Sequence, residues 1–233
     1  MKKLIIALMG CCLISCSSGI EGEGAATAHK EFKSEGFSSL EVSCNCDVIL
    51  IPSDSTKIVV ESHQNLVDNL EVSTKGKDLF IKENKSVDTY DLYNVIVYFN
   101  PDLKEVELKK QANLKISGTL KANAMKFDLT DQTSIAEAFL EVTDLELNMD
   151  EQSKAQLTGT VITLEIDSSD EAMADLTGLQ AVEVEFSASD KSQLKLHALK
   201  DLKGKASENA VVSYKGDPKK DTTEKDKALI QQN

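Results

Sequence analysis

The chain has 233 residues, of which 39 are acidic and 26 are Lys or Arg, so its formal net charge is −13. A surface this acidic repels the phosphates of nucleic acids, which excludes nucleic-acid binding as a function. Trp is absent and aromatic residues make up 5% of the chain, which argues against a lectin that stacks sugars on aromatic rings.

The first fifteen residues have the pattern of an export signal. Lys2 and Lys3 precede an uncharged apolar run, Leu4 to Ile14, that is shorter than the roughly 20 residues of a membrane-spanning helix. The run leads into Leu13-Ile14-Ser15-Cys16, which resembles the lipobox of bacterial lipoproteins. The alternative is an ordinary secretory signal with incidental cysteines.

The lipobox resemblance implies that residues 1–15 are removed and that lipid is attached to Cys16. Loss of the two leader lysines takes the net charge from −13 to −15. Each buried acyl methylene contributes about 0.8 kcal/mol, so several chains hold a protein to a membrane almost permanently. Ser17 does not resemble the inner-membrane retention signal, which favours the outer membrane, on its cell-surface or its periplasmic face.

The remainder of the chain divides into three parts by composition. Residues 16–35 are rich in Ser, Gly, Ala and Glu and predict a flexible tether. Residues 36–218 alternate apolar and polar side chains and predict a β domain. Residues 219–233 are a charged C-terminal tail with little to bury.

The first part of the β domain predicts separate short strands. Gln64 to Leu70 is the exception, because Leu66 and Leu70 are spaced as on one face of a helical turn. The predicted strands are Leu40 to Val42, Val48 to Ile51, Lys57 to Glu61, Leu79 to Ile81 and Val95 to Phe99.

Two cysteines remain beyond the leader and Cys16. Cys44 and Cys46 are two residues apart, and in an extended strand their Cα atoms would lie about 6.5–7 Å from each other. That distance is at or beyond the limit for a disulfide. We therefore expect two small core residues, with a redox pair or half of a metal site as the alternatives.

A repeat of about 20 residues is the strongest structural feature of the sequence. Each unit has two short alternating strands, separated from each other by a polar turn and from the next unit by a small residue. The small residues are Gly118, Ala138, Gly159, Gly178, Ala198 and Gly216. Stacked coils of this length predict a parallel β-helix, in which like residues lie above like. An antiparallel meander is the alternative, but it does not explain why acidic turns alternate with Gly/Ala turns.

Four turn aspartates recur with the same period: Asp131, Asp150, Asp170 and Asp190. In a β-helix they would form a file, and unit charges 4–5 Å apart repel by about 1 kcal/mol per pair even in water. Backbone N–H groups of the turns or a calcium ion would offset that repulsion. We expect solvated aspartates that cap backbone donors, with calcium binding as the alternative.

The order and spacing of several segments resemble the auto-transporter adhesin head GIN domain family of Bacteroidetes lipoproteins. The matching segments are Phe37 to Val42, Cys46 to Leu50, Asn65-Leu66, Gly76 to Ile81 and Tyr214 to Pro218. The resemblance implies a right-handed parallel β-helix and a non-catalytic, lipid-anchored envelope protein. The family's Ser-Gly-Ser-Gly turns are replaced here by acidic or Gln/Ala turns such as Asp150 to Ser153.

The sequence favours a binding module over an enzyme. His29, His63 and His197 are isolated, and no nucleophile elbow or phosphate-binding loop is present. A polysaccharide lyase on a β-helix would need a basic cleft, whereas the exposed strand positions mix Lys and Glu. We expect no cofactor and an unidentified protein or glycan ligand for adhesion or scaffolding. The alternative is a periplasm-facing lipoprotein that acts in envelope stress or polysaccharide handling.

Overall fold

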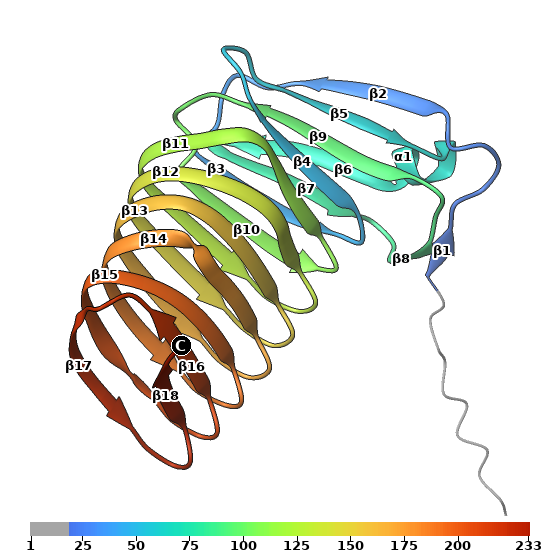
Figure 1. Ribbon diagram of the computed structural model, residues 1–233. Coiled ribbons are helices and arrows are strands. Elements are labelled where there is room, and N and C mark those ends of the chain that lie inside the picture. Colours follow the sequence, from blue (N-terminus) through green and yellow to red (C-terminus); the bar gives the residue numbers. More distant parts are fainter. Residues whose placement is uncertain (1–18) are drawn as a thin grey trace, which may run out of the picture.

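Alternation of apolar and polar side chains makes almost every segment of this chain a strand. The computed structural model describes residues 19–233, and in these the strands stack into an elongated rod (Figure 1). The N-terminal third comprises β1 (Ile20–Glu21), β2 (Ala28–Lys33), β3 (Ser39–Cys44), β4 (Asp47–Pro52), β5 (Lys57–Ser62), α1 (Gln64–Asn69), β6 (Leu70–Lys75), β7 (Asp78–Glu83), β8 (Val87–Thr89) and β9 (Tyr93–Phe99). α1 and the five predicted strands in this part are confirmed.

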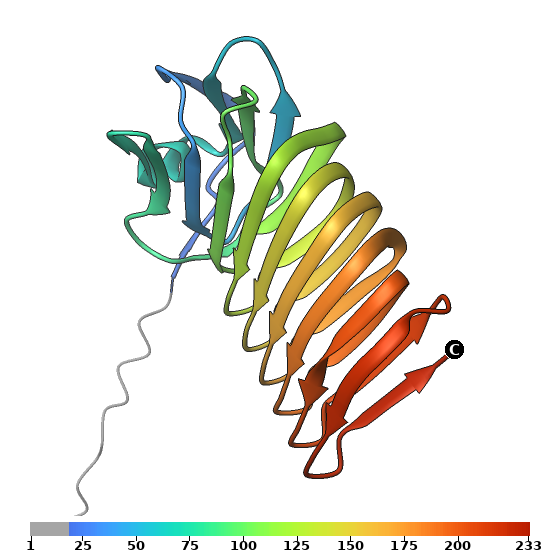
Figure 2. The ribbon, with the colours of Figure 1, turned by 90° about the vertical axis from the view of Figure 1, so that its left-hand side faces the viewer.

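The remaining strands form the coils of a parallel β-solenoid, which confirms the predicted β-helix (Figure 2). The strands are β10 (Glu105–Lys110), β11 (Asn113–Leu129), β12 (Ser134–Met149), β13 (Lys154–Ser168), β14 (Met173–Ala188), β15 (Gln193–Ala206), β16 (Val211–Lys215), β17 (Lys219–Glu224) and β18 (Leu229–Gln232). Each of β11–β15 bends around one coil, so its first and last segments lie on opposite faces of the rod.

Two faces enclose the core. The first face contains β2, β5, β9 and β4, then the first segments of β11–β15, and finally β16 and β18. The second face contains β6, β7, β3 and β10, then the last segments of β11–β15, and β17. Antiparallel pairing occurs at β2–β5, β5–β9 and β6–β7, so the N-terminal third closes one end of the parallel stack.

Apolar ladders hold the coils together. On the first face one ladder is Leu114, Ile135, Ala155, Ala174, Leu194 and Val212, all buried and in direct register. On the second face one ladder is Val106, Phe127, Leu147, Ile166 and Phe186. The period of about 20 residues therefore places like side chains above like, as predicted, and each coil buries its inward face against its neighbours.

Small residues recur at the corner that follows the first segment of each coil. Gly118, Gly159 and Gly216 have positive φ angles of 100°, 117° and 104° there. At Gly159 a Cβ would overlap the carbonyl oxygen of Leu140 on the preceding coil. The corner therefore needs glycine both for its backbone conformation and for the close approach of successive coils.

The prediction of a flexible tether over residues 16–35 is wrong for most of that range. β1 pairs with β8, and β2 pairs with β5 along its whole length. The small residues of this segment suggested a flexible linker, but in the structure they permit close backbone contacts. Residues 16–18 lie outside the described part of the chain, as does the leader 1–15.

The charged tail predicted over 219–233, with little to bury, forms two strands. β17 pairs with residues 201–206 of β15, and β18 pairs with residues 211–214 of β16. Backbone hydrogen bonds extend the ladder independently of side-chain character, and most side chains of this terminal coil are exposed. Among residues 19–233, no helix is long and apolar enough to span a membrane.

Candidate binding surface

An acidic edge runs along the solenoid at the turn that precedes each first-face segment. The turn residues with positive φ carry carboxylates on six successive turns: Asp131, Glu151, Asp170, Asp190, Glu208 and Asp226. Backbone hydrogen bonds between neighbouring turns fix this alignment, since Gln152 N–H donates to Asp131 O at 2.9 Å and Glu171 N–H donates to Glu151 O at 2.9 Å.

The predicted file of aspartates is therefore wrong at Asp150. Asp150 precedes the positive-φ position by one residue, and Glu151 occupies it instead. The carboxylate of Asp150 accepts hydrogen bonds from Glu151 N–H at 2.8 Å and from the Ser169 hydroxyl at 2.7 Å. The carboxylate of Asp131 accepts one from Lys110 N–H. These two side chains cap turn donors, as turn aspartates commonly do.

Like charges along the acidic edge alter several pKa values. The pKa of Glu151 is raised by partial desolvation and by the carboxylates of Asp131 and Asp170. A hydrogen bond shared with Asp150 raises the pKa of Asp170, and the Ser169 hydroxyl lowers that of Asp150. In residues 19–233, no three His, Cys, Asp or Glu side chains are gathered as a metal site requires, so we propose no calcium site here.

A shallow groove lies beside the acidic edge and crosses four successive coils, those of β12–β15. It consists of adjoining hollows, one of which has a mostly apolar lining and a volume of about 400 Å³ at the start of β12–β15. We call its lining the binding strip, and it has three side-chain ladders. They are Gln132, Gln152 and Glu171 in the turns, Ser134, Lys154 and Met173 at the strand starts, and Gln156, Asp175 and Lys195 within the strands.

The binding strip offers hydrogen-bond donors and acceptors at every coil. Neighbouring ladder members lie about 4.8 Å apart because that is the spacing between paired strands. Lys195 Nζ is 3.5 Å from the Asp175 carboxylate, and Lys191 Nζ at the edge is 3.2 Å from Glu171. Both pairs are half-exposed, so they stabilise the fold little and their charged groups are accessible to a ligand. The strip suits an extended polar ligand that spans several coils.

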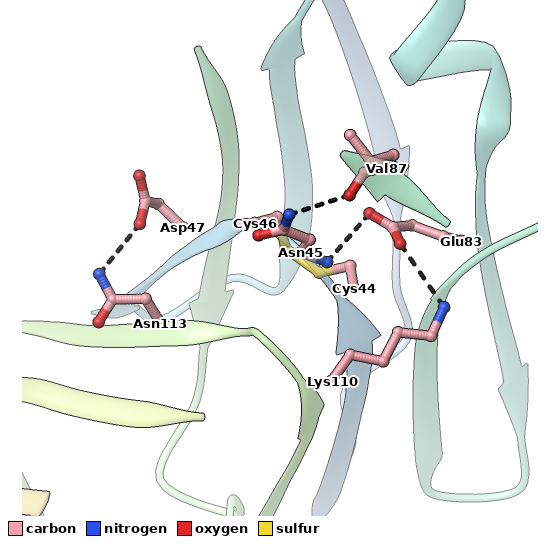
Figure 3. The surroundings of a disulfide bond; sticks show 8 residues. All are labelled: Cys44, Asn45, Cys46, Asp47, Glu83, Val87, Lys110 and Asn113. Carbon is pink, nitrogen blue, oxygen red and sulfur yellow. Dashed lines mark hydrogen bonds and ion pairs between the residues drawn. A yellow bond between two sulfur atoms is a disulfide. The ribbon is translucent and has the colours of Figure 1, made fainter. Parts of the chain in front are cut away.

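The structure joins Cys44 and Cys46 in a disulfide, contrary to the expectation of two unpaired core residues (Figure 3). The expectation assumed a straight strand, but β3 ends at Cys44 and the chain bends through Asn45 before β4 begins. The bend brings the Cα atoms to 5.4 Å, which a disulfide can bridge. Both cysteines are buried, so the bond closes a corner of the fold and lies outside the binding strip.

A buried carboxylate supports the same corner. Glu83 Oε1 accepts a hydrogen bond from Asn45 N–H at 3.0 Å, and Oε2 lies 3.5 Å from Lys110 Nζ (Figure 3). Burial raises the pKa of Glu83, and the hydrogen bond from Asn45 and the charge of Lys110 oppose that shift only in part. Glu83 thus links β7, the β3–β4 corner and the first coil.

The three histidines have different surroundings. His29 is exposed near Glu61, and His63 is buried beside α1. His197 lies in β15, where burial and then Lys215 lower its pKa. The predicted lipidation site, Cys16, lies outside the described residues.

Sequence reasoning did not identify the binding strip. The sequence does contain a signal for the alignment of the turns. A small residue that is buried in the structure ends each turn and sets the register of the coils: Ala112, Thr133, Ser153, Ala172, Ser192 and Ala210. Counting from these residues aligns Asp131 with Glu151 and Lys154 with Met173, as the structure does.

The fold and its coil repeat agree with comparisons to known proteins. The family model described as "Putative auto-transporter adhesin, head GIN domain" matches residues 36–218. The chain belongs to this family. No protein with a curated description matches it significantly.

Solved structures share the family fold over nearly the whole chain. A crystal structure titled a putative adhesin from Bacteroides fragilis has a TM-score of 0.85 at 17% identity and covers 92% of this chain and 100% of its own. A putative lipid binding protein from Parabacteroides distasonis has a TM-score of 0.73 at 19% identity, with 92% and 99% covered. A putative adhesin from Parabacteroides merdae has a TM-score of 0.67 at 17% identity, with 93% and 100% covered.

Proposed function

We propose that this head GIN domain protein is a lipid-anchored, non-catalytic protein of the cell envelope that binds an extended glycan or protein through the binding strip. The observation that carries the proposal is the continuity of the strip across the four coils of β12–β15. A polymer laid across the coils meets the same kinds of polar group at each step, so weak contacts add along its length. The family description and the solenoid fold both fit surface binding.

The membrane anchor in this proposal is lipid on Cys16. Support comes from the lipobox-like sequence Leu13 to Cys16 and from the preceding apolar run. An outer-membrane location follows from the residue after Cys16, and cell-surface exposure would suit adhesion. The second candidate is a periplasm-facing lipoprotein that handles polysaccharide or acts in envelope stress, because the strip would also accept a polymer there.

Paired variants test the strip. Lys154→Ala with Gln156→Ala removes two of its hydrogen-bonding side chains, whereas Lys203→Ala with Gln180→Ala removes the same residue types outside the strip. Both sets are exposed, so neither should unfold the protein. Binding is measured by biolayer interferometry against immobilised polysaccharides and extracellular-matrix proteins. We expect the strip variant to bind at least tenfold more weakly and the control to match the wild type; equal affinities would refute the strip.

Proteinase K digestion of intact cells separates the two candidates. Loss of the protein while a periplasmic control survives supports an adhesive or scaffolding role at the cell surface. Protection of the protein until the outer membrane is permeabilised supports the periplasm-facing alternative and removes adhesion from consideration.

A further inference from the structure

The N-terminal segment is hydrogen-bonded to the end of the rod. Ile20 N–H donates to Ser86 O at 2.8 Å, and Gly22 N–H donates to Thr89 O at 2.8 Å. These bonds place β1 alongside β8 from its first residue (Figure 1). The segment is therefore attached to the domain well before β2 begins at Ala28.

Side chains at the start of α1 hold the same segment. Asn65 Nδ2 donates to Glu21 O at 2.7 Å, and its Oδ1 accepts from Glu23 N–H at 3.0 Å. Buried His63 has Nδ1 3.0 Å from Gly24 O, and its Nε2 accepts from Asp91 N–H at 3.2 Å. One neutral tautomer, protonated on Nδ1, satisfies both contacts of His63. We call these interactions the N-terminal clamp.

The clamp requires glycine where the chain passes closest to the domain. A Cβ on Gly22 would overlap the His63 ring, and a Cβ on Gly19 would lie 2.7 Å from Ser86 O. The glycines that suggest a flexible linker by composition are thus the residues that let the backbone pack against β8 and α1.

From the clamp we propose that the β1–β8 end of the rod lies against the membrane and that the C-terminal coils point away from it. The inference rests on the proposed lipid at Cys16. However residues 17–19 are arranged, four residue steps from Cys16 to Ile20 span at most about 14 Å. Without the clamp the first fixed residue would be Ala28, and twelve steps would reach about 42 Å. The clamp therefore shortens the reach of the anchor about threefold.

The rod then has a membrane-proximal and a distal end. β1 and β8 lie at the opposite end of the stack from the C-terminus (Figures 1 and 2). Seven pairing steps separate β4 from β18, about 34 Å at 4.8 Å per step. The proximal end exposes Lys85, Asp88 and Asp91, so its contact is with polar headgroups rather than with the acyl region.

Site-specific quenching tests this orientation. The full lipoprotein, made in bacteria and purified, carries a fluorophore on one introduced cysteine, from Lys85→Cys at the proximal end or Lys219→Cys in β17. The acylated sulfur of Cys16 and the buried Cys44–Cys46 disulfide do not react with the label. Each protein is reconstituted into phosphatidylcholine vesicles that contain a lipid with a nitroxide on its headgroup.

We expect at least threefold stronger quenching at position 85 than at position 219. A twenty-residue Gly/Ser insertion between Ser18 and Gly19 should bring the two values close together, because it lengthens the reach and leaves the clamp intact. Equal quenching in the uninserted protein, or stronger quenching at 219, overturns the orientation. Vesicle flotation and the mass of the amino-terminal peptide test the anchor separately: an unacylated Cys16 overturns both proposals, whereas an acylated protein with equal quenching overturns this one alone.

Discussion

Substituting Gly159 by Ala should reveal how tightly successive coils pack at their corners. Gly159 has a φ of 117°, and a Cβ there would overlap the carbonyl oxygen of Leu140 and lie 2.8 Å from its nitrogen. Holding Ala at this φ costs about 1–3 kcal/mol. Forcing the methyl group against the backbone of the preceding coil adds about 1–3 kcal/mol. The expected loss in free energy of unfolding is therefore about 2–6 kcal/mol.

Gly118 provides a matched control in the first long strand. Its φ of 100° is similar, but a Cβ there has no heavy atom within 4 Å. Gly118→Ala should therefore cost only the backbone contribution, about 1–3 kcal/mol. The difference between the two variants isolates the contact between coils.

Urea unfolding followed by circular dichroism measures that difference. With a slope of about 2 kcal/mol per molar urea, the midpoint of Gly159→Ala should lie about 0.5–1.5 M below that of Gly118→Ala. Equal midpoints would refute the argument, because they would show that the corner needs glycine for its φ angle alone and that the coils can separate to admit a methyl group.

Two further predictions concern the corner at the disulfide. Glu83→Gln keeps an acceptor for the Asn45 N–H but removes the buried carboxyl group, whose pKa is raised above its ordinary value of 4.5. The folded state binds that proton more tightly than the unfolded state. The wild type should therefore gain stability relative to the variant as the pH falls from 7 through the raised pKa, and this gain should be complete below 4.5. A difference in melting temperature between the two proteins that stays constant over this pH range would contradict the prediction. Replacing Cys44 and Cys46 by Ala opens a very short loop, so urea unfolding should show a loss of only about 1–2 kcal/mol; a variant that fails to fold would show that the bond does more than constrain the unfolded chain.

The core of the solenoid could be predicted because its constraint is periodic. A residue such as Leu114 must lie above Ile135 and below Val48, so the same face recurs about every 20 residues in the coils. Alternation within each strand then determines which side chains point inward. Any error of one residue would expose a whole ladder, which is why the apolar pattern determines the register so strongly.

The turns were harder to predict because they carry no apolar ladder of their own. The sequence offers both Asp150 and Glu151 as partners for Asp131, at spacings that differ by one residue. The buried Ser153, which lies above Ala172 in the stack, decides between them, since the next residues Lys154 and Met173 are in register. The position of a turn residue relative to the buried core determines where its side chain lies, whether that residue is Asp or Glu.

Contacts between distant segments account for the other errors. The tether prediction failed because the backbone partners of β1 lie more than 60 residues away, in β8. Composition reports that Gly22 is flexible in an unfolded chain, but it does not report that a histidine ring fills the space where its side chain would be. The disulfide was missed for a similar reason, because Asn45, at the bend between the two cysteines, donates a hydrogen bond to Glu83 on another strand.

The pairing of the N-terminal segment also affects how the rod would present its binding strip. A flexible tether would let the rod take any orientation, so neither end of the binding strip would preferentially point outward. With lipid on Cys16 as proposed, the clamped segment would hold one end of the rod near the membrane, and the coils that carry the strip would stand beyond the N-terminal third. The strip runs along the stacking direction of β12–β15, so in that proposed orientation a bound polymer would extend away from the membrane rather than parallel to it. The proposed orientation would suit a partner that approaches the rod from the side away from the membrane.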